Sequence, residues 1–488
     1  MIVAVTALVG ARGQNKELTK IGAESKKVNP DMLLNAQYLG ALDGVDMWLT
    51  KSEDGVKGLA NKRDWHVVKL SDALIPIERA DLPKTHQCEL LGAACYQQNA
   101  LVLLVDSSAS GRTTIFGARV STDSLRLAEG RLDTVDHYTY GRKDRCKVWS
   151  AVSPNGRYFA VLTRVLHKAK DTVYVTKVLD ENLNEVWSKD FNFGYPEVVY
   201  VDDNGKVYAM ETERIQDGMT FKMTLIDRSG ADSYSNEKKC DPVQDLQIVN
   251  VIGKKVLCTG LYKSAAAKPK EDVTSGVVTM VFDVDSMSLT KFNIRPYEND
   301  DKNIILNEHT IRDQQRVRDL PMMTPLGSLR MPYGALLAVG HHHSLRYVNA
   351  NGSVTNTFNG MGVILLAIDM NGNVKWVRHI RRNDISGLSD ATIALHMFAD
   401  GETAYVVKNE TPKAPALYDI AKKAREYEVG DKSNLVLYGI SASGEVTKSI
   451  LEKNTKQVMA NIGSRKDGSC AVLTFRGSKC RMAVLETK

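Results

Sequence analysis

The run His341-His342-His343, which follows the apolar stretch GALLAVG, is the most conspicuous candidate for chemistry in the sequence. Alternate side chains of an extended strand share a face, so His341 and His343 would lie on one side and His342 on the other. Two imidazoles could hold Zn²⁺ or a similar ion together with a carboxylate from elsewhere in the chain. The sequence does not identify that carboxylate. We therefore expect His341 and His343 to form hydrogen bonds in a binding site, with no bound metal.

A basic segment at 307–320, NEHTIRDQQRVRDL, is the second candidate. We expect a short helix here, which would present Arg312 and Arg316 to an anionic group of a ligand. The alternative is simple charge balancing, because the same segment also carries acidic residues.

Motifs of well-characterised catalytic and cofactor sites are absent from the sequence. It contains no GxSxG elbow, HExxH pair, P-loop or EF-hand loop. A carboxylate pair for glycoside chemistry can come from distant segments, and with 58 Asp and Glu residues no pair can be chosen. We assign no catalytic residue and expect no cofactor.

Length and composition restrict the classes of protein. A chain of 488 residues exceeds the usual size of one domain, about 100–200 residues, so it holds several domains or one repeat architecture. The net charge of +6 is too small to indicate a nucleic-acid partner. No apolar run reaches the roughly 18 residues of a membrane-spanning helix. The seven cysteines form no CxxC motif, and we expect most of them to be buried as small apolar side chains.

The first thirteen residues, MIVAVTALVGARG, resemble a signal peptide. An apolar stretch is followed by the small residues Ala11 and Gly13, and cleavage there would leave Gln14 first. No basic residue precedes the apolar stretch, so the alternative is a terminal strand over 3–9 in an intracellular scaffold. We expect secretion or export to a periplasm, with residues 14–488 as one domain.

A strand–turn–strand pattern recurs along the chain and is its strongest structural signal. Asp, Asn, Ser and Gly fill the turns, because these residues tolerate a tight backbone and bond to it locally. An earlier hairpin precedes many copies, so each unit contains four antiparallel strands. This recurrence predicts an all-β fold, a single β-propeller. The copies begin at Val67, Ala118, Val178, Thr224, Val281, Ala367 and Tyr438, and the earlier hairpins begin at Ser150, Val199, Ile248, His396 and Gly463.

The last unit has only three strands, near 458–464, 470–475 and 480–486. An open propeller would leave a row of unpaired backbone groups. We therefore expect an N-terminal strand, around 17–23 or, if no signal is removed, 3–9, to close the ring. The result is eight four-stranded blades, with seven as the alternative because the first unit is the least clear.

The segment SPNGRYFAVLT at 153–163 is similar to the S-P-[ND]-G-x-x-[ILFV]-[AV] turn and strand of many propellers. In blade pattern the chain thus resembles WD40-type and TolB-like propellers. The Trp-Asp and Gly-His pairs of WD40 blades do not recur. The resemblance extends over the whole chain as architecture but over only about ten residues as motif. It implies a fold and no catalytic residue.

Long connections are predicted between the second and third strands of units, at 167–172, 264–275, 344–362 and 411–433, and between units at 296–328. In a propeller these connections share one face, here called the loop-rich face, and we expect partners to bind there. The stretch 415–429 has the pattern of a helix on this face.

The leading hypothesis is an exported, monomeric, non-enzymatic propeller that presents its loop-rich face to a protein or glycan. The alternative is a hydrolase or lyase that acts on an extracellular polymer at the axial mouth of the same face.

Overall fold

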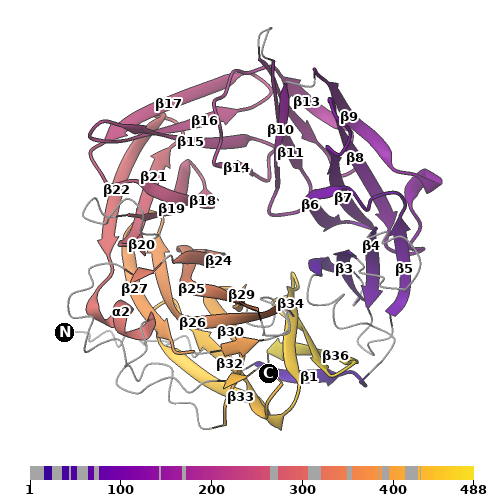
Figure 1. Ribbon diagram of the computed structural model, residues 1–488, viewed down its shortest axis with the longest axis vertical. Helices are drawn as coiled ribbons and strands as arrows, with labels where there is room; N and C mark the ends of the chain where they lie inside the picture. The colour runs from indigo at the N-terminus through magenta and orange to yellow at the C-terminus, as the bar shows by residue number, and fades with distance from the viewer. Residues whose placement is uncertain are drawn as a thin grey trace, which may run out of the picture.

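The computed structural model describes residues 16–24, 36–42, 45–51, 64–70, 76–141, 144–167, 172–263, 273–305, 320–321, 323–348, 354–382, 384–386, 395–412, 427–428 and 430–487. These residues form eight four-stranded antiparallel blades arranged in a ring (Figure 1). In this part of the chain the helical elements are α2 (Asn299–Ile305) and the short 3₁₀ helix η1 (Ala128–Gly130). The protein is an eight-bladed β-propeller, so the predicted fold class is confirmed and the seven-bladed alternative is wrong.

In each blade the first strand lies nearest the axis and the fourth lies at the rim (Figure 1). From axis to rim, the strands of the first four blades are β2 (Gln37–Leu42), β3 (Val45–Lys51), β4 (Trp65–Leu70) and β5 (Pro76–Leu82) in blade 1; β6 (Glu89–Tyr96), β7 (Asn99–Asp106), β8 (Arg112–Ser121) and β9 (Asp133–Thr139) in blade 2; β10 (Arg145–Val152), β11 (Phe159–Leu166), β12 (Val173–Leu179) and β13 (Glu185–Lys189) in blade 3; and β14 (Val198–Val201), β15 (Val207–Ile215), β16 (Gly218–Ile226) and β17 (Ala231–Lys238) in blade 4. The strands of the last four blades, in the same order, are β18 (Val243–Ile252), β19 (Lys255–Tyr262), β21 (Gly276–Asp283) and β22 (Ser288–Pro296) in blade 5; β24 (Thr324–Met331), β25 (Gly334–Val348), β26 (Val354–Asp369) and β27 (Val374–Ile380) in blade 6; β29 (His396–Asp400), β30 (Thr403–Glu410), β32 (Ser433–Ile440) and β33 (Val446–Thr455) in blade 7; and β34 (Val458–Ser464), β35 (Cys470–Arg476), β36 (Lys479–Thr487) and β1 (Lys16–Ile21) in blade 8.

Four short strands lie outside this pattern. Strand β20 (Val273–Thr274) pairs with β23 (Leu320–Pro321), while β28 (Asp384–Ser386) and β31 (Tyr427–Glu428) extend the sheet of blade 6.

The N-terminal and C-terminal parts of the chain meet at two places. At the rim, β1 pairs antiparallel with β36, with Lys16 opposite Thr487. Near the axis, β34 of blade 8 contacts β2 of blade 1, as successive inner strands do all round the ring. The ring is therefore continuous.

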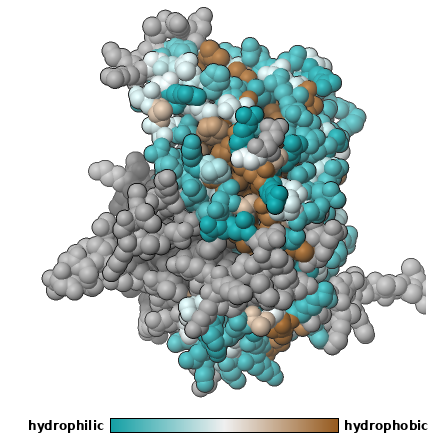
Figure 2. All heavy atoms as spheres, turned by 90° about the vertical axis from the view of Figure 1, so that its right-hand side faces the viewer, coloured by the Kyte–Doolittle hydropathy of each residue, from teal (hydrophilic) through white to brown (hydrophobic). Residues whose placement is uncertain are grey.

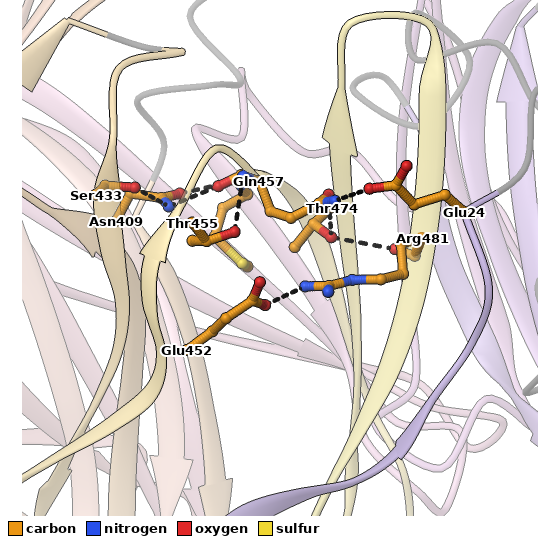
Figure 3. A network of polar contacts seen from close by, with 9 residues as sticks. Glu24, Asn409, Ser433, Glu452, Thr455, Gln457, Thr474 and Arg481 are labelled. Atoms are coloured by element: carbon orange, nitrogen blue, oxygen red, sulfur yellow. Dashed lines mark hydrogen bonds and ion pairs between the residues drawn. The ribbon is translucent and has the colours of Figure 1, made fainter.

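Polar contacts fasten the segment after β1 to blades 7 and 8 (Figure 3). The Gln457 Nε2 atom donates to Glu24 Oε1 at 2.8 Å, and its Oε1 accepts from Thr474 Oγ1 at 3.1 Å. The Asn409 Nδ2 atom of blade 7 donates to the Gln457 carbonyl at 2.8 Å. Because Gln457 is buried, each of these bonds replaces one to water and fixes its partner in place.

Local hydrogen bonds explain why the Asp-containing turns recur. The Asp202 carboxylate accepts from the backbone N–H groups two and four residues further on, at 2.8 and 2.9 Å. Asp180 and Asp369 make the same pair of bonds. In the turns of Asp202 and Asp369, the Gly three residues later has a positive φ of 76°, which favours glycine. Each such turn is set by its own few residues.

Apolar faces of neighbouring blades form the core between them. The second strands carry the most buried runs, as in β7 and β30, because these strands are covered on both faces. Trp187 and Trp376, at equivalent positions of blades 3 and 6, are both buried in this layer. On the side of the ring formed by blades 1 and 2, hydrophilic residues cover most of the visible described surface and hydrophobic ones show in a narrower band (Figure 2).

Two predictions about connections are wrong. The repeat copy at Ala118 does not lead directly into a fourth strand: Leu125 turns inward and is buried, Leu127 makes one isolated bridge to Val120, and the rim strand is β9. The predicted loop at 344–362 is largely strand, because β25 and β26 continue as a paired hairpin from Gly334 to Asp369.

The structure describes little of the two segments that were predicted as helices. The segment predicted as a helix at 307–320 lies outside the described residues, apart from the start of β23 at Leu320. The same holds for 415–429, except that Tyr427–Glu428 is the short strand β31 and not helix. Helix α2 occupies part of the connection predicted at 296–328. The backbone of Ile304 in this helix lies so close to Gly362 that position 362 has no room for a side chain. Among the described residues no helix is long and apolar enough to cross a membrane.

Candidate binding site on the loop-rich face

The structure does not test the site residues that were singled out from the sequence. His341 and His343 lie in β25, where the pairing with β26 is irregular between Gly340 and His342. The positions of their side chains lie outside what is described, as do Arg312 and Arg316 altogether. Their proposed role in binding stays a prediction.

A pocket of about 620 Å³ opens on the loop-rich face, near the axis. It lies where four successive inner strands begin, those of blades 3, 4, 5 and 6. Its volume falls within the range of about 300–1,000 Å³ that is usual for small-ligand sites. The residues around it are Lys147, Trp149, Tyr195, Pro196, Glu197, Asp245, Leu246, Gln247, Thr324 and Pro325.

Tyr195 is the most exposed aromatic side chain of this pocket, at 55%. It belongs to the connection FNFGYPE between blades 3 and 4. Phe193 anchors this connection: it is fully buried, with its ring 6.0 Å from that of Trp149 and 5.1 Å from that of Tyr174. Pro196, on the other side of Tyr195, is also buried. Tyr195 is thus held at the surface between two buried neighbours.

The backbone beside Tyr195 is fixed from both sides. Arg164 Nη1 donates to the Gly194 carbonyl at 2.6 Å, and the Gly194 N–H donates to Glu211 Oε2 at 3.0 Å. A Cβ atom at position 194 would collide with that same Glu211 oxygen, so a larger residue here would displace the Glu211 carboxylate. Lys222 lies 3.5 Å from the other oxygen of Glu211 and balances its charge.

The register of the strands in blade 3 places two cationic side chains, Lys147 and Arg164, beneath the ring of Tyr195. Lys147 is opposite Arg164, and Arg164 is opposite Tyr174, so the three side chains share one face of blade 3. The Lys147 ammonium lies 4.1 Å from the Tyr195 ring centre and 5.3 Å from that of Trp149. The Arg164 guanidinium lies 5.8 Å from the Tyr195 ring centre. These are cation–π distances.

Two carboxyl groups, those of Glu197 and Asp245, also line the pocket and are here called its acidic wall. Glu197 accepts a hydrogen bond from the Thr212 hydroxyl. Asp245 has a φ of 52°, in the left-handed region that side chains seldom adopt, and partial burial raises the pKa of its carboxyl. Strained backbone and a shifted pKa are frequent at functional sites. The pocket therefore combines an aromatic and cationic wall with two carboxyl groups.

The other mouth of the ring has a smaller pocket, of about 350 Å³, among the short turns of blades 1, 2, 3 and 8. Small side chains and backbone line most of it, with Tyr38, Gln97 and Lys466 among the larger residues. Within the described residues, no three His, Cys, Asp or Glu side chains are grouped to hold a metal ion. Five of the seven cysteines are buried and all are free thiols, which agrees with their expected role as small apolar side chains.

No motif in the sequence marks the Tyr195 pocket, although the enzyme alternative predicts a site at the axial mouth of this face. The available signal was the aromatic-rich connection FNFGYPE, where Gly and Pro flank a tyrosine. Nothing in the sequence alone shows that Lys147 and Arg164 lie beneath that tyrosine, because this depends on strand register.

The architecture defines the class of protein: a β-propeller, with the blade pattern of WD40 and related propellers. No family model matches the chain, and no curated protein does. Among solved structures, the WD40 domain of SCAP from fission yeast is similar, at 9% identity and a TM-score of 0.37, over 96% of this chain and 98% of that one.

Two enzyme structures have comparable similarity. The polysaccharide lyase Uly1 is 8% identical, with a TM-score of 0.37, over 96% of this chain and all (100%) of the lyase chain. A puromycin-hydrolyzing peptidase of Mycobacterium tuberculosis is 8% identical, with a TM-score of 0.36, over 94% of this chain and 61% of the peptidase. Similarities of this size support no conclusion about this chain, and its propeller fold follows from its own eight four-stranded blades.

Proposed function

We propose that this protein is an exported, monomeric binding propeller that holds a protein or glycan ligand on its loop-rich face, in the Tyr195 pocket. One observation carries the proposal: an aromatic side chain is kept exposed at the axial mouth by a buried Phe193, a clamped Gly194 and a buried Pro196. Rigid aromatic residues provide large contact area at little cost in conformational entropy. Residues 1–13 would direct the export, and N-terminal sequencing of the native protein tests this part.

The substitution Tyr195→Ala is expected to weaken ligand binding about tenfold or more, because truncating an aromatic anchor usually costs at least about 2 kcal/mol. Ligands are first selected with the wild-type protein from a glycan array and from a displayed peptide library. Affinities of the selected ligands are then measured by calorimetry for wild type and variant.

Two variants control this experiment. Tyr195→Phe keeps the ring and should retain most of the affinity, whereas Ile294→Ala removes a similarly exposed side chain from the rim strand β22 and should change nothing. If every selected ligand binds Tyr195→Ala as tightly as wild type, the pocket is not the binding site.

A second candidate function is hydrolysis or lysis of a bound polymer. The observation that favours it is the pair of carboxyl groups on one wall, with the raised pKa and left-handed backbone of Asp245. A carboxyl group with a raised pKa is suited to donating or accepting a proton near neutral pH. Ligands recovered after prolonged incubation distinguish the two functions: a binding protein returns them intact, and an enzyme returns shortened products.

The proposed role of β1 is to close the ring. Its Lys16 is fully buried at the junction with blade 7, where Nζ lies 2.7 Å from both Asp400 Oδ2 and the Gly468 carbonyl and 5.2 Å from the Tyr405 ring centre. Lys16→Ala is therefore expected to lower the free energy of unfolding by about 2–4 kcal/mol.

Lys20→Ala is the matched control for this change, because Lys20 belongs to the same strand but is 53% exposed, with a longer ion pair to Glu486. Denaturant midpoints of both variants give the comparison. Equal effects at the two positions would contradict a closing role for β1.

A further inference from the structure

The aromatic wall of the Tyr195 pocket carries positive charge that the described residues do not neutralise. The ion pairs of the described residues include neither Lys147 nor Arg164, although Lys177, on the same sheet, contacts two carboxylates. Lys147 is exposed and its ammonium is held over two aromatic rings. An ordered, unpaired cation at the edge of a pocket is suited to an anionic ligand group.

Arg164 adds a second donor beneath the same tyrosine. One of its terminal nitrogens is used by the Gly194 carbonyl, while its Nε atom is buried without a hydrogen-bond partner. A buried donor left unpaired costs free energy that a bound acceptor can recover. The guanidinium also strengthens the local positive potential, because it is less screened by solvent than an exposed side chain.

We propose that the ligand of this pocket is an acidic glycan, with one sugar ring against Tyr195 and its carboxylate or sulfate group at Lys147. The less polar face of a sugar ring suits the exposed aromatic face. The acidic wall then has a role: Asp245 and Glu197, together with Gln247, accept hydrogen bonds from sugar hydroxyl groups. The inference rests on the proposed function and names the ligand class for that site.

The acidic wall also distinguishes a glycan from a single-stranded nucleic acid, which likewise combines stacking rings with anions. A nucleic acid carries a phosphate at every residue and is bound in grooves that are basic throughout. Asp245 and Glu197, which line the same pocket, would repel such a backbone. A glycan with one acidic group per sugar and several neutral hydroxyls matches both walls.

The test uses three probes of equal length: a galacturonate hexamer, a neutral galactose hexamer and a sulfated galactose hexamer. We expect the acidic hexamers to bind the wild-type protein at least tenfold more tightly than the neutral one, with affinity that falls as salt is added. Lys147→Gln should remove about tenfold of the affinity for the acidic hexamers and change the affinity for the neutral one much less. Lys466→Gln, which changes a lysine at the opposite mouth, should have no effect.

The outcomes separate this inference from the function on which it rests. The acidic-glycan assignment is overturned if the protein prefers the neutral hexamer, or if Lys147→Gln binds the acidic hexamers as tightly as wild type. The proposed function survives either result as long as binding still depends on Tyr195. A single-stranded oligonucleotide that binds more tightly than any hexamer also overturns it. Absence of all saccharide binding overturns it as well, and peptide ligands that depend on Tyr195 would then identify the site as a protein-binding one.

Discussion

Replacing Arg465 by alanine is expected to lower the free energy of unfolding by about 3–5 kcal/mol, the largest effect on stability that we predict. Arg465 belongs to blade 8 and forms a two-pronged ion pair with Asp46 of blade 1, with Nε–Oδ1 and Nη2–Oδ2 distances of 3.0 and 2.5 Å. Asp46 is fully buried. Without Arg465, the side-chain partner left to Asp46 among the described residues is the Tyr38 hydroxyl, at 3.0 Å, which cannot compensate a buried charge.

The position of this pair makes the effect specific to the junction between the first and last blades. A ring has as many junctions as blades, so weakening one junction exposes the apolar faces on both sides of it. Urea unfolding followed by tryptophan fluorescence reports this directly, because Trp48 is buried in the core between blades 8 and 1.

Two further variants control the Arg465 experiment. Arg157→Ala removes an arginine whose ion pair with Glu181 is largely exposed, and little change in stability is expected. The double variant Asp46→Leu/Arg465→Met removes both charges and should recover much of the loss, since no buried charge remains unpaired. A single Arg465→Ala variant as stable as wild type would show that this pair does not hold the junction.

The strands and turns of this fold could be predicted because they are set by neighbouring residues. The turn at Asp202 depends on its own carboxylate and on Gly205, all within five residues, and the same pattern recurs at Asp369. The final strands were placed within one residue for the same reason: alternating apolar residues mark β34, β35 and β36. Repetition then supplied the architecture.

Departures from the prediction arise where residues distant in sequence decide the structure. Leu125 turns inward because blade 2 offers it a buried site, although its segment has the pattern of a strand. The hairpin of β25 and β26 extends past the blade because Tyr347 and Thr355 continue to pair. Polar composition at 344–362 indicated a loop, but backbone pairing requires no apolar side chains.

The position of the candidate site could be predicted from the sequence, but the side chains that form it could not. Connections between inner strands meet at the axis of any propeller, so the axial mouth of the loop-rich face follows from the fold. Which side chains meet there depends on register: Lys147 and Arg164 become neighbours only because β10 and β11 pair as they do. His341 and His343 form part of a run of one residue type, which is visible in the sequence. The Tyr195 pocket is lined by short segments from four different blades, which is not.

The second large effect concerns Asp301, which fastens helix α2 to blade 6. The carboxylate is fully buried, and Oδ1 lies 2.7 Å from His379 Nε2 while Oδ2 lies 2.9 Å from Arg295 Nη2 and accepts from the Glu298 N–H at 2.9 Å. The last bond is the backward half of a capping box, since Glu298 is the residue just before the helix. One side chain therefore caps α2 and joins it to β22 and β27.

Asp301→Asn is expected to lower the free energy of unfolding at pH 7 by about 2–4 kcal/mol, because the partners His379 and Arg295 lose a charged acceptor. The loss of stability caused by this substitution should be larger at neutral pH than at acidic pH. Burial alone would raise the pKa of Asp301, but the bonds from His379 and Glu298 and the charge of Arg295 outweigh it and hold the pKa below its usual range. A carboxyl group with a lowered pKa stabilises the fold above its ordinary pKa, near 4, and loses that contribution as the pH falls through the lowered value.

The wild-type protein therefore loses a stability contribution on acidification that Asp301→Asn never has, and the difference between the two should narrow below about pH 4. Denaturant midpoints at neutral and acidic pH measure the difference, and amide hydrogen exchange of Asn299–Ile305 shows whether α2 is released first. Asp300→Asn, an exposed change on the same helix, should leave both measurements as they are in wild type. If the difference in stability between wild type and Asp301→Asn stays constant with pH, the charge of Asp301 is not what holds α2 on the propeller.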